Sequence, residues 1–319
     1  MRTTISKLTF LSLYGIGGLL ILSSLLWLSS CTSNSNKLEI KPANATIPAA
    51  TISPSVKVPA NNLTTKVNNA QRVVALTSLS ADIIHRLSPT RLVGITGSKL
   101  LESNPAFSQL PRVAEGRTPP NLEKIVALKP DLVIGAAGMH DQVLAQLTSS
   151  GIPTLATKVD RWDTLASLTK ILAGTVQADP APLLKSYQGY FKPKPTNPAS
   201  TLILASDQPL LAPNSKSWAG DLLTQFGVKN VVADLQGKSQ FAGYLTLSPE
   251  KLVTIDPEVI ILINAPGSDI SKIKANPLFK GLKATKNNRV YVFDYYGLVN
   301  PGSVASIDRA TKQLRQIYR

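Results

Sequence analysis

The chain has 319 residues, a formal net charge of +15 and a single cysteine, Cys31. This length allows two lobes or one large domain, and one cysteine excludes an intramolecular disulfide and a metal site built on several thiolates. The charge suits an anionic ligand or an anionic lipid surface. Nucleic acid is not an expected partner, because Lys and Arg are scattered without a long basic run.

The first predicted segment is an export signal over residues 1–30. A charged start, an apolar run over 10–28 and small residues before Cys31 are typical of a secretory signal. The sequence Leu-Ser-Ser-Cys at 28–31 resembles a bacterial lipobox, in which the cysteine is lipidated and becomes the mature N-terminus. We therefore expect a protein that is lipid-anchored to the outer side of the cytoplasmic membrane, where nucleic acid is absent. The alternative is a single-pass membrane anchor, since roughly 18 apolar residues can span a bilayer.

Residues 31–70 are rich in Ser, Thr, Asn, Pro and Ala and lack apolar periodicity. Such a segment cannot bury enough apolar surface to offset chain entropy. The sequence therefore predicts a disordered linker, and order is expected to begin at Arg72.

Strands and helices are predicted to alternate over 71–178, the first lobe. Ser80 is expected to cap the first helix. Such alternation favours a parallel sheet with helices on both faces. The predicted strands are 72–76, 92–96, 132–134 and 153–156, and the predicted helices are 80–87, 121–128, 141–149 and one from Asp163 onward.

A connecting segment over 179–198 is predicted to hold one helix, 180–191, which Pro193 and Pro195 end. The alternating pattern then returns over 199–319, the second lobe. The predicted strands there are 201–205, 230–232, 258–263 and 289–293, and the predicted helices are 218–226, 249–255 and 303–318.

One stretch of the first lobe matches one of the second. Residues 121–134 and 248–261 both read as a capped helix, a proline break, an acidic residue and a buried strand. Glu123 and Glu250 fall at the same place in the two copies. The two halves are therefore interpreted as similar α/β lobes.

These segments together resemble the helical-backbone, or cluster A-III, substrate-binding proteins of ABC importers for ferric siderophores, cobalamin and haem. The resemblance implies an α/β fold of two Rossmann-like lobes joined by a single long helix, with the ligand cleft between the lobes. It also implies a monomer that partners an ABC permease and its ATPase. Open α/β sheets bind ligands beyond their strand carboxyl ends, so the residues alone predict the same location. The matching segments are 72–82, 121–134, 215–231, 248–261 and 287–292.

Two glutamates are candidates for docking to the permease. The family uses one surface glutamate per lobe to meet arginines of the permease, and Glu123 and Glu250 lie at the matching positions. Two separated carboxylates would fix the orientation of the complex. The alternative is that each glutamate only favours its helix dipole or completes a cap.

The cleft is expected to be lined by loops that follow the strands. Arg117 can pair with carboxylate or catecholate oxygens of a ferric chelate, and the aromatic candidates can stack on a planar chelate or pack in the core. A ferric siderophore or citrate-like iron chelate is thus the leading ligand, with cobalamin and haem as alternatives. The candidate residues are Ser78, Arg117, His140, Trp162, Trp218, Tyr244, Tyr295 and Tyr296.

His140 and Tyr244 are also a candidate axial pair for haem iron, since some haem-binding members of the family use such ligands. The alternative for His140 is a histidine at the start of a helix, on the rim of the cleft. With two histidines in the chain, we expect no resident metal or cofactor.

No enzyme is expected, because the G-x-S-x-G, P-loop and H-E-x-x-H motifs are missing from the sequence. A hydrolytic site of His140, Asp141 and Ser206 is the alternative from another class, and their spacing does not support it.

Overall fold

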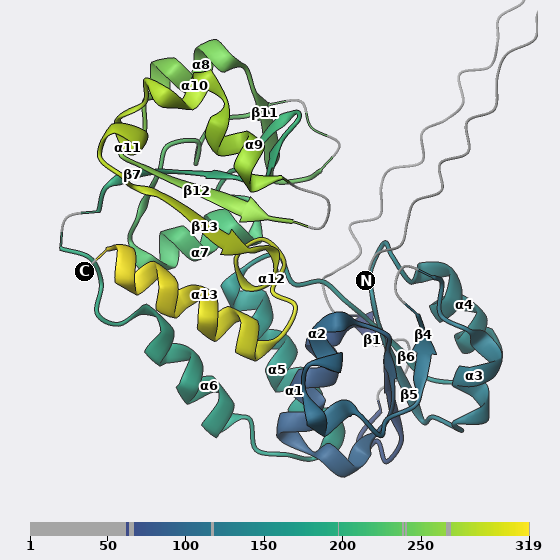
Figure 1. The fold of residues 1–319 in the computed structure, drawn as a ribbon. Helices are drawn as coiled ribbons and strands as arrows, with labels where there is room; N and C mark the ends of the chain where they lie inside the picture. The colour runs from purple at the N-terminus through teal and green to yellow at the C-terminus, as the bar shows by residue number, and fades with distance from the viewer. Residues whose placement is uncertain are drawn as a thin grey trace, which may run out of the picture. The chain divides into compact units, whose positions relative to one another are not determined.

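A computed structural model of the chain describes residues 62–63, 67–115, 118–196, 198–237, 239, 241–265 and 269–318. These residues all belong to one compact unit, Val56–Arg319. Two parallel sheets with flanking helices dominate it (Figure 1). The predicted signal, Cys31 and most of the predicted linker lie outside the described residues.

The first sheet has the order β1-β6-β5-β2-β3-β4, and its pairs are parallel except that β1 runs antiparallel to β6. Its strands are β1 (Asn62–Leu63), β2 (Val73–Ala75), β3 (Leu92–Thr96), β4 (Arg112–Ala114), β5 (Leu132–Ala136) and β6 (Thr154–Thr157). The helices of this lobe are α1 (Ser78–Leu87), η1 (Pro89–Arg91), α2 (Lys99–Glu102), η2 (Pro105–Phe107), α3 (Leu122–Ala127), α4 (Asp141–Ser149) and α5 (Trp162–Val176).

The linker interpretation of residues 31–70 is wrong at its C-terminal end. Asn62 and Leu63 pair with Ala156 and Leu155 as an edge strand. Ala70 is 1% exposed, and its backbone N–H donates to the Thr175 carbonyl at 2.8 Å. Order therefore begins before Arg72, because the exposed edge of β6 offers this short polar segment backbone partners.

The connection between the sheets contains α6 (Ala181–Gln188) and the 3₁₀ turn η3 (Gly189–Phe191). Together they coincide with the helix predicted over 180–191. Tyr187 and Tyr190 are buried on the stripe that faces the core, and the helical turn ends before Pro193, as expected from its fixed φ.

The second lobe contains a parallel sheet of order β10-β7-β12-β13 and a small antiparallel sheet of order β11-β9-β8. Its strands are β7 (Ser200–Leu204), β8 (Ser206–Asp207), β9 (Leu210–Pro213), β10 (Lys229–Asn230), β11 (Tyr244–Leu247), β12 (Val259–Asn264) and β13 (Val290–Asp294). Its helices are α7 (Trp218–Phe226), α8 (Pro249–Ile255), α9 (Ile270–Ala275), α10 (Pro277–Lys280), α11 (Lys283–Lys286), α12 (Tyr295–Leu298) and α13 (Val304–Ile317).

The two lobes repeat one topology, as the sequence match predicts. The strands β3-β2-β5-β6 of the first sheet have the same order and direction as β10-β7-β12-β13 of the second. In chain order this makes α1 equivalent to α7, α3 to α8, and α5 to α13.

The matched segments 121–134 and 248–261 also form equivalent hydrogen bonds. Asn121 Oδ1 accepts from the Lys124 N–H at 2.8 Å, and Ser248 Oγ accepts from the Lys251 N–H at 3.2 Å, so both helices have the predicted caps. The acidic residue after each proline break binds the first strand of its own lobe. Asp131 accepts from the backbone N–H of Arg72 at 2.9 Å, and Glu258 accepts from that of Ser200 at 2.7 Å.

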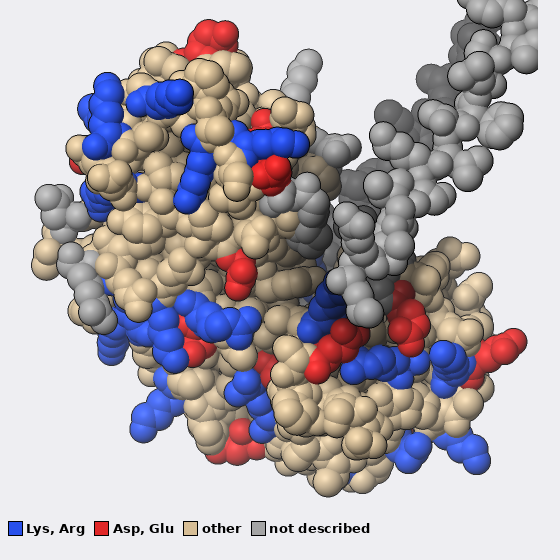
Figure 2. All heavy atoms as spheres, in the orientation of Figure 1, with Lys and Arg blue, Asp and Glu red and all other residues tan. Residues whose placement is uncertain are grey.

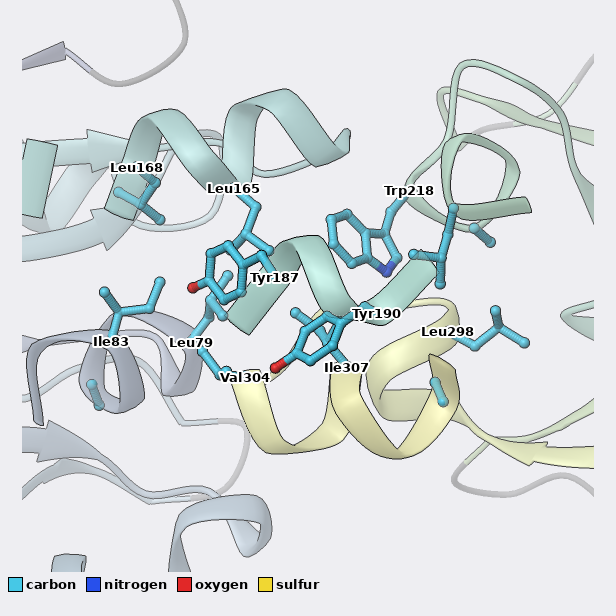
Figure 3. Packing of buried hydrophobic residues seen from close by; sticks show 14 of the residues in the cluster. Leu79, Ile83, Leu165, Leu168, Tyr187, Tyr190, Trp218, Leu298, Val304 and Ile307 are labelled. Atoms are coloured by element: carbon cyan, nitrogen blue, oxygen red, sulfur yellow. The ribbon is translucent and has the colours of Figure 1, made fainter. Parts of the chain in front are cut away.

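The largest apolar core runs through both lobes. Leu202 and Val74 belong to separate clusters on the outer faces of the two sheets. The inner faces instead share one cluster through helices α1, α5, α6, α7 and α13. Figure 3 shows this packing, with Leu79, Ile83, Leu165, Leu168, Tyr187, Tyr190, Trp218, Leu298, Val304 and Ile307 labelled. Burial of this shared core holds the two lobes together.

Among the residues that the structure describes, no helix is long and apolar enough to cross a bilayer.

Candidate functional site

Ser78 lies where β2 ends, as the first residue of α1, and is half-buried. The helix begins earlier than predicted. Thr77, not Ser80, is the N-cap, and its Oγ1 accepts from the Ser80 N–H at 3.2 Å. Ser80 is fully buried, so tertiary packing placed the predicted cap inside the helix. Ser78 is thereby held at the carboxyl edge of the sheet, where open α/β sheets bind ligands.

His140 follows β5 at the same edge and is the N-cap residue of α4. It is 8% exposed, and its Nδ1 accepts from the Ala136 N–H at 2.9 Å. Burial lowers the pKa of His140, and the neighbouring Asp141 opposes this only in part. His140 is therefore a neutral imidazole at pH 7 that carries its proton on Nε2.

Arg117 lies outside the described residues. Arg161, a further cation at the carboxyl edge, is exposed and pairs with Asp163 at 3.2 Å.

Three predicted tyrosines gather in the second lobe. Tyr295 and Tyr296 follow β13, and their ring centroids are 5.3 Å apart. Tyr244 begins β11, with its ring centroid 6.5 Å from that of Phe241. Burial and then the proximity of Tyr295 raise the pKa of Tyr244, so this phenol is protonated at neutral pH.

One point brings loops of both lobes into contact. A Cβ on Gly302 would lie 2.7 Å from Tyr296 Cδ1 and 2.9 Å from Leu100 Cδ2. Leu100 belongs to α2, which follows β3 of the first lobe. The bare glycine, with a φ of +55°, therefore lets the loop after β3 approach the tyrosines of the second lobe. Within the described residues, no hydrogen bond or ring contact joins His140 to Tyr244.

Trp162 and Trp218 pack together in the helical core. Their ring centroids are 5.9 Å apart, and Trp162 also meets Phe191 edge-on at 4.5 Å. Trp218 is 4% exposed, and its Nε1 donates to the Gly297 carbonyl at 2.9 Å. This placement favours a structural contribution by the two indoles, through burial and an aromatic contact.

The docking candidates Glu123 and Glu250 are both exposed, in the first turns of α3 and α8. Among the described residues, neither carboxylate has an ion-pair partner within 4.0 Å. The Glu250 backbone N–H and the Ser248 hydroxyl lower the pKa of Glu250, which keeps it charged. Each lobe therefore offers one anionic group to a partner.

Two residues that the sequence analysis did not select join the lobes. Asp82 Oδ2 accepts from the Val304 N–H, and Asp221 Oδ2 accepts from the Trp162 N–H, both at 2.7 Å. The available signal was a Ser-x-x-x-Asp pattern that occurs at 78–82 and again at 217–221.

No cluster of three or more metal-ligating side chains occurs among the described residues. A hollow of about 410 Å³ lies elsewhere, beside the connecting segment. Its lining is Lys192, Pro193, Lys194, Pro195, Thr196, Phe226, Arg315 and Tyr318.

The duplicated α/β architecture has aromatic and polar loops at the strand ends of both lobes. This arrangement is typical of a two-lobed binding protein. The chain belongs to the periplasmic binding protein family, whose model matches residues 73–181 and 192–296. It is a substrate-binding protein of the cluster that serves ABC importers, which confirms the resemblance inferred from the sequence.

Individual relatives agree with this assignment. The Fe(3+)-citrate-binding protein YfmC of Bacillus subtilis is 30% identical over 271 residues, which cover 80% of this chain and 83% of the relative. The high-affinity heme uptake system protein IsdE of Staphylococcus aureus is 29% identical over 128 residues, or 38% of this chain and 41% of the relative.

The solved structure of the periplasmic heme binding protein HutB of Vibrio cholerae superimposes with a TM-score of 0.64 at 20% identity. It covers 78% of this chain and 99% of HutB. This likeness confirms the predicted fold class.

Proposed function

We propose that this protein captures an iron(III) chelate of the siderophore or citrate type and delivers it, as a monomer, to an ABC permease and its ATPase. Lipid on Cys31 holds it at the outer side of the cytoplasmic membrane. Capture involves no covalent chemistry, so specificity comes from groups that are largely in place before binding.

The similarity to the Fe(3+)-citrate-binding relative is the main support for an iron chelate as the ligand. It spans 80% of this chain, which is long enough to include both lobes. The net charge of +15 also favours an anionic ligand over a neutral one.

The chemistry of the tyrosine cluster fits such a ligand. Ferric citrate and siderophores present carboxylate, catecholate or hydroxamate oxygens, which accept hydrogen bonds. Burial keeps the phenol of Tyr244 neutral in the free protein, so it can donate one. Tyr295 lies near enough to raise the pKa of Tyr244, and its ring contacts that of Tyr296. Arg117 supplies a cation for the chelate oxygens.

Fluorescence of Trp162 and Trp218 provides the test. The protein is titrated with ferric citrate, a ferric catecholate, a ferric hydroxamate, haemin and cyanocobalamin. Quenching by an anionic ferric chelate is expected, and Arg117→Ala should weaken it about tenfold, the loss of roughly 1.4 kcal/mol from one charged contact. Arg309→Ala, an exposed residue of α13, is the matched control. Binding of cyanocobalamin alone, or equal affinities of the two variants, would contradict the chelate assignment.

Haem is the second candidate, because the haem-uptake relative matches 38% of this chain and His140 is a neutral imidazole. Haem ligation predicts a Soret band on mixing with haemin that His140→Ala or Tyr244→Ala weakens. A site for a ferric chelate predicts that the Soret band of haemin stays as in free haemin, whereas haem ligation shifts and sharpens it, so the same titration separates the candidates.

The anchor is tested with Cys31→Ser. We expect the variant to leave the membrane fraction, or to remain unprocessed, while its soluble body binds the chelate as before. Normal processing and full membrane retention would show that Cys31 is not the anchor.

A further inference from the structure

Exposed apolar side chains mark the same two helices as the docking glutamates. Four large apolar residues are strongly exposed in the described parts of the chain: Val126 at 45%, Met139 at 77%, Phe241 at 51% and Val253 at 53%. Met139 and Phe241 lie on loops of the candidate ligand site. Val126 and Val253 lie away from it, on α3 and α8.

The two valines occupy one position of the internal repeat. Each lies three residues after its glutamate, so carboxylate and valine share a face of the helix. The residue between them that anchors the helix, Ile125 or Leu252, is fully buried. Each lobe therefore presents a negative charge and an apolar side chain side by side.

Nothing in the fold accounts for valine at these positions. A β-branched residue is a poorer helix former than Ala, Lys or Glu. At about half exposure it also leaves apolar surface in water. The fully buried residue of each helix is Ile125 or Leu252, whereas about half of each valine side chain is exposed and can contact a partner.

Long-range electrostatic attraction cannot by itself bring a cationic partner to this protein, because the protein is itself basic. Lysines and arginines are scattered over the face shown in Figure 2, and the net charge is +15. An exposed lysine, Lys124 or Lys251, also follows each glutamate directly. Long-range repulsion therefore opposes a broadly basic surface, and affinity must come from short-range contacts.

We infer that Val126 and Val253 complete two equivalent docking sites, each of which binds a cation beside an apolar recess on the permease. This inference rests on the proposed function. Because the two sites carry the same residues, Glu-Lys-x-Val, the two lobes should contribute alike to binding.

The experiment measures binding of the full-length protein to its permease and ATPase, held in lipid nanodiscs, over a series of salt concentrations. Val126→Thr and Val253→Thr, singly and together, remove apolar surface but keep the branched shape. Glu123→Gln with Glu250→Gln tests docking itself. Gln146→Thr with Gln316→Thr adds threonine at exposed sites of α4 and α13 as the matched control. Chelate binding and thermal unfolding are followed for every variant.

The double threonine variant is expected to raise the Kd about tenfold at every salt concentration, with chelate binding unchanged. The double glutamine variant should instead flatten the salt dependence. Equal losses from Val126→Thr and Val253→Thr support two equivalent docking sites, and an effect confined to one of them overturns the equivalence. If the threonine variant matches the control while the glutamine variant fails to bind, the inference is wrong and the proposed function stands. If the unaltered protein does not bind, the proposed function itself fails.

Discussion

Asp82 and Asp221 lie near the starts of two equivalent helices, and each carboxylate accepts from the first backbone N–H of the closing helix of the other lobe. Asp82 in α1 accepts from Val304 at the start of α13, and Asp221 in α7 accepts from Trp162 at the start of α5, both at 2.7 Å. A carboxylate at a helix N-terminus satisfies an unpaired donor and interacts favourably with the helix dipole. The lobes are therefore joined by reciprocal contacts around the shared core.

Removal of either carboxylate should destabilise the protein. Asp82 is 3% and Asp221 is 7% exposed, so alanine leaves a buried N–H without a partner. We expect Asp82→Ala and Asp221→Ala each to lower the free energy of unfolding by about 2 kcal/mol in urea denaturation. Asp163→Ala, with 68% of its side chain exposed in the first turn of α5, should change it by less than about 0.5 kcal/mol. A loss at Asp221 no larger than at Asp163 would contradict this reading.

Gly220 should not tolerate a side chain. A Cβ there would lie 1.9 Å from the Asn214 carbonyl oxygen, which is backbone and cannot rotate away. Gly220→Ala is expected to destabilise by about 3 kcal/mol. Gly174→Ala in α5, where a Cβ meets nothing within 4 Å, should instead stabilise by about 0.5–1 kcal/mol. Thermal unfolding of both variants tests this prediction. If Gly220→Ala leaves the stability unchanged, the close approach of Gly220 to the Asn214 carbonyl is contradicted.

Stability should fall in mild acid because of His140. Burial lowers the pKa of His140 in the folded protein, so the unfolded chain binds the proton more readily. The stability that the neutral form of His140 contributes is fully present above about pH 6.5, the usual pKa of histidine, and is lost as the pH falls below that value. His140→Asn keeps an acceptor for the Ala136 N–H but cannot titrate. Unfolding free energies at pH 7.5 and pH 5 should therefore differ less for the variant, and identical differences would contradict the assignment.

Tyr318 should make the free energy of unfolding fall at alkaline pH. Burial raises its pKa to about 12, and its hydroxyl lies 2.6 Å from Thr201 Oγ1. The unfolded chain ionises near the usual pKa of about 10, so this stability is present below that pH and is lost as the pH rises toward 12. Tyr318→Phe should reduce the decline in unfolding free energy between pH 9 and pH 11. An unchanged decline would mean that other groups cause it.

Much of the fold could be predicted because its signals are local. The predicted helix caps Asn121 and Ser248 both accept from backbone N–H groups as caps do. The buried strands around Val133 and Ile261 are short apolar runs that contrast with polar loops. The strands β1, β4, β8, β9 and β11 were missed, since such short segments gain their structure from a neighbouring strand rather than from their own composition.

The candidate site was less predictable. Sequence order placed His140, Tyr295 and Tyr296 after strands, where the structure has them, whereas Tyr244 begins a strand, β11. It could not distinguish Trp218, an indole in the core, from Tyr244 beside a loop, because an aromatic residue after a strand fits either location. Nor could it show that Leu100 approaches Tyr296 across Gly302.

The order of strands and helices, the caps and the duplication follow from the chain alone, because each depends on residues that are close in sequence. The reciprocal contacts of Asp82 and Asp221 join residues 222 and 59 positions apart, and only the packing of four helices brings them together. The same holds for the exposure of Val126 and Val253. Which face of a short helix meets water is decided by the core that covers the other face.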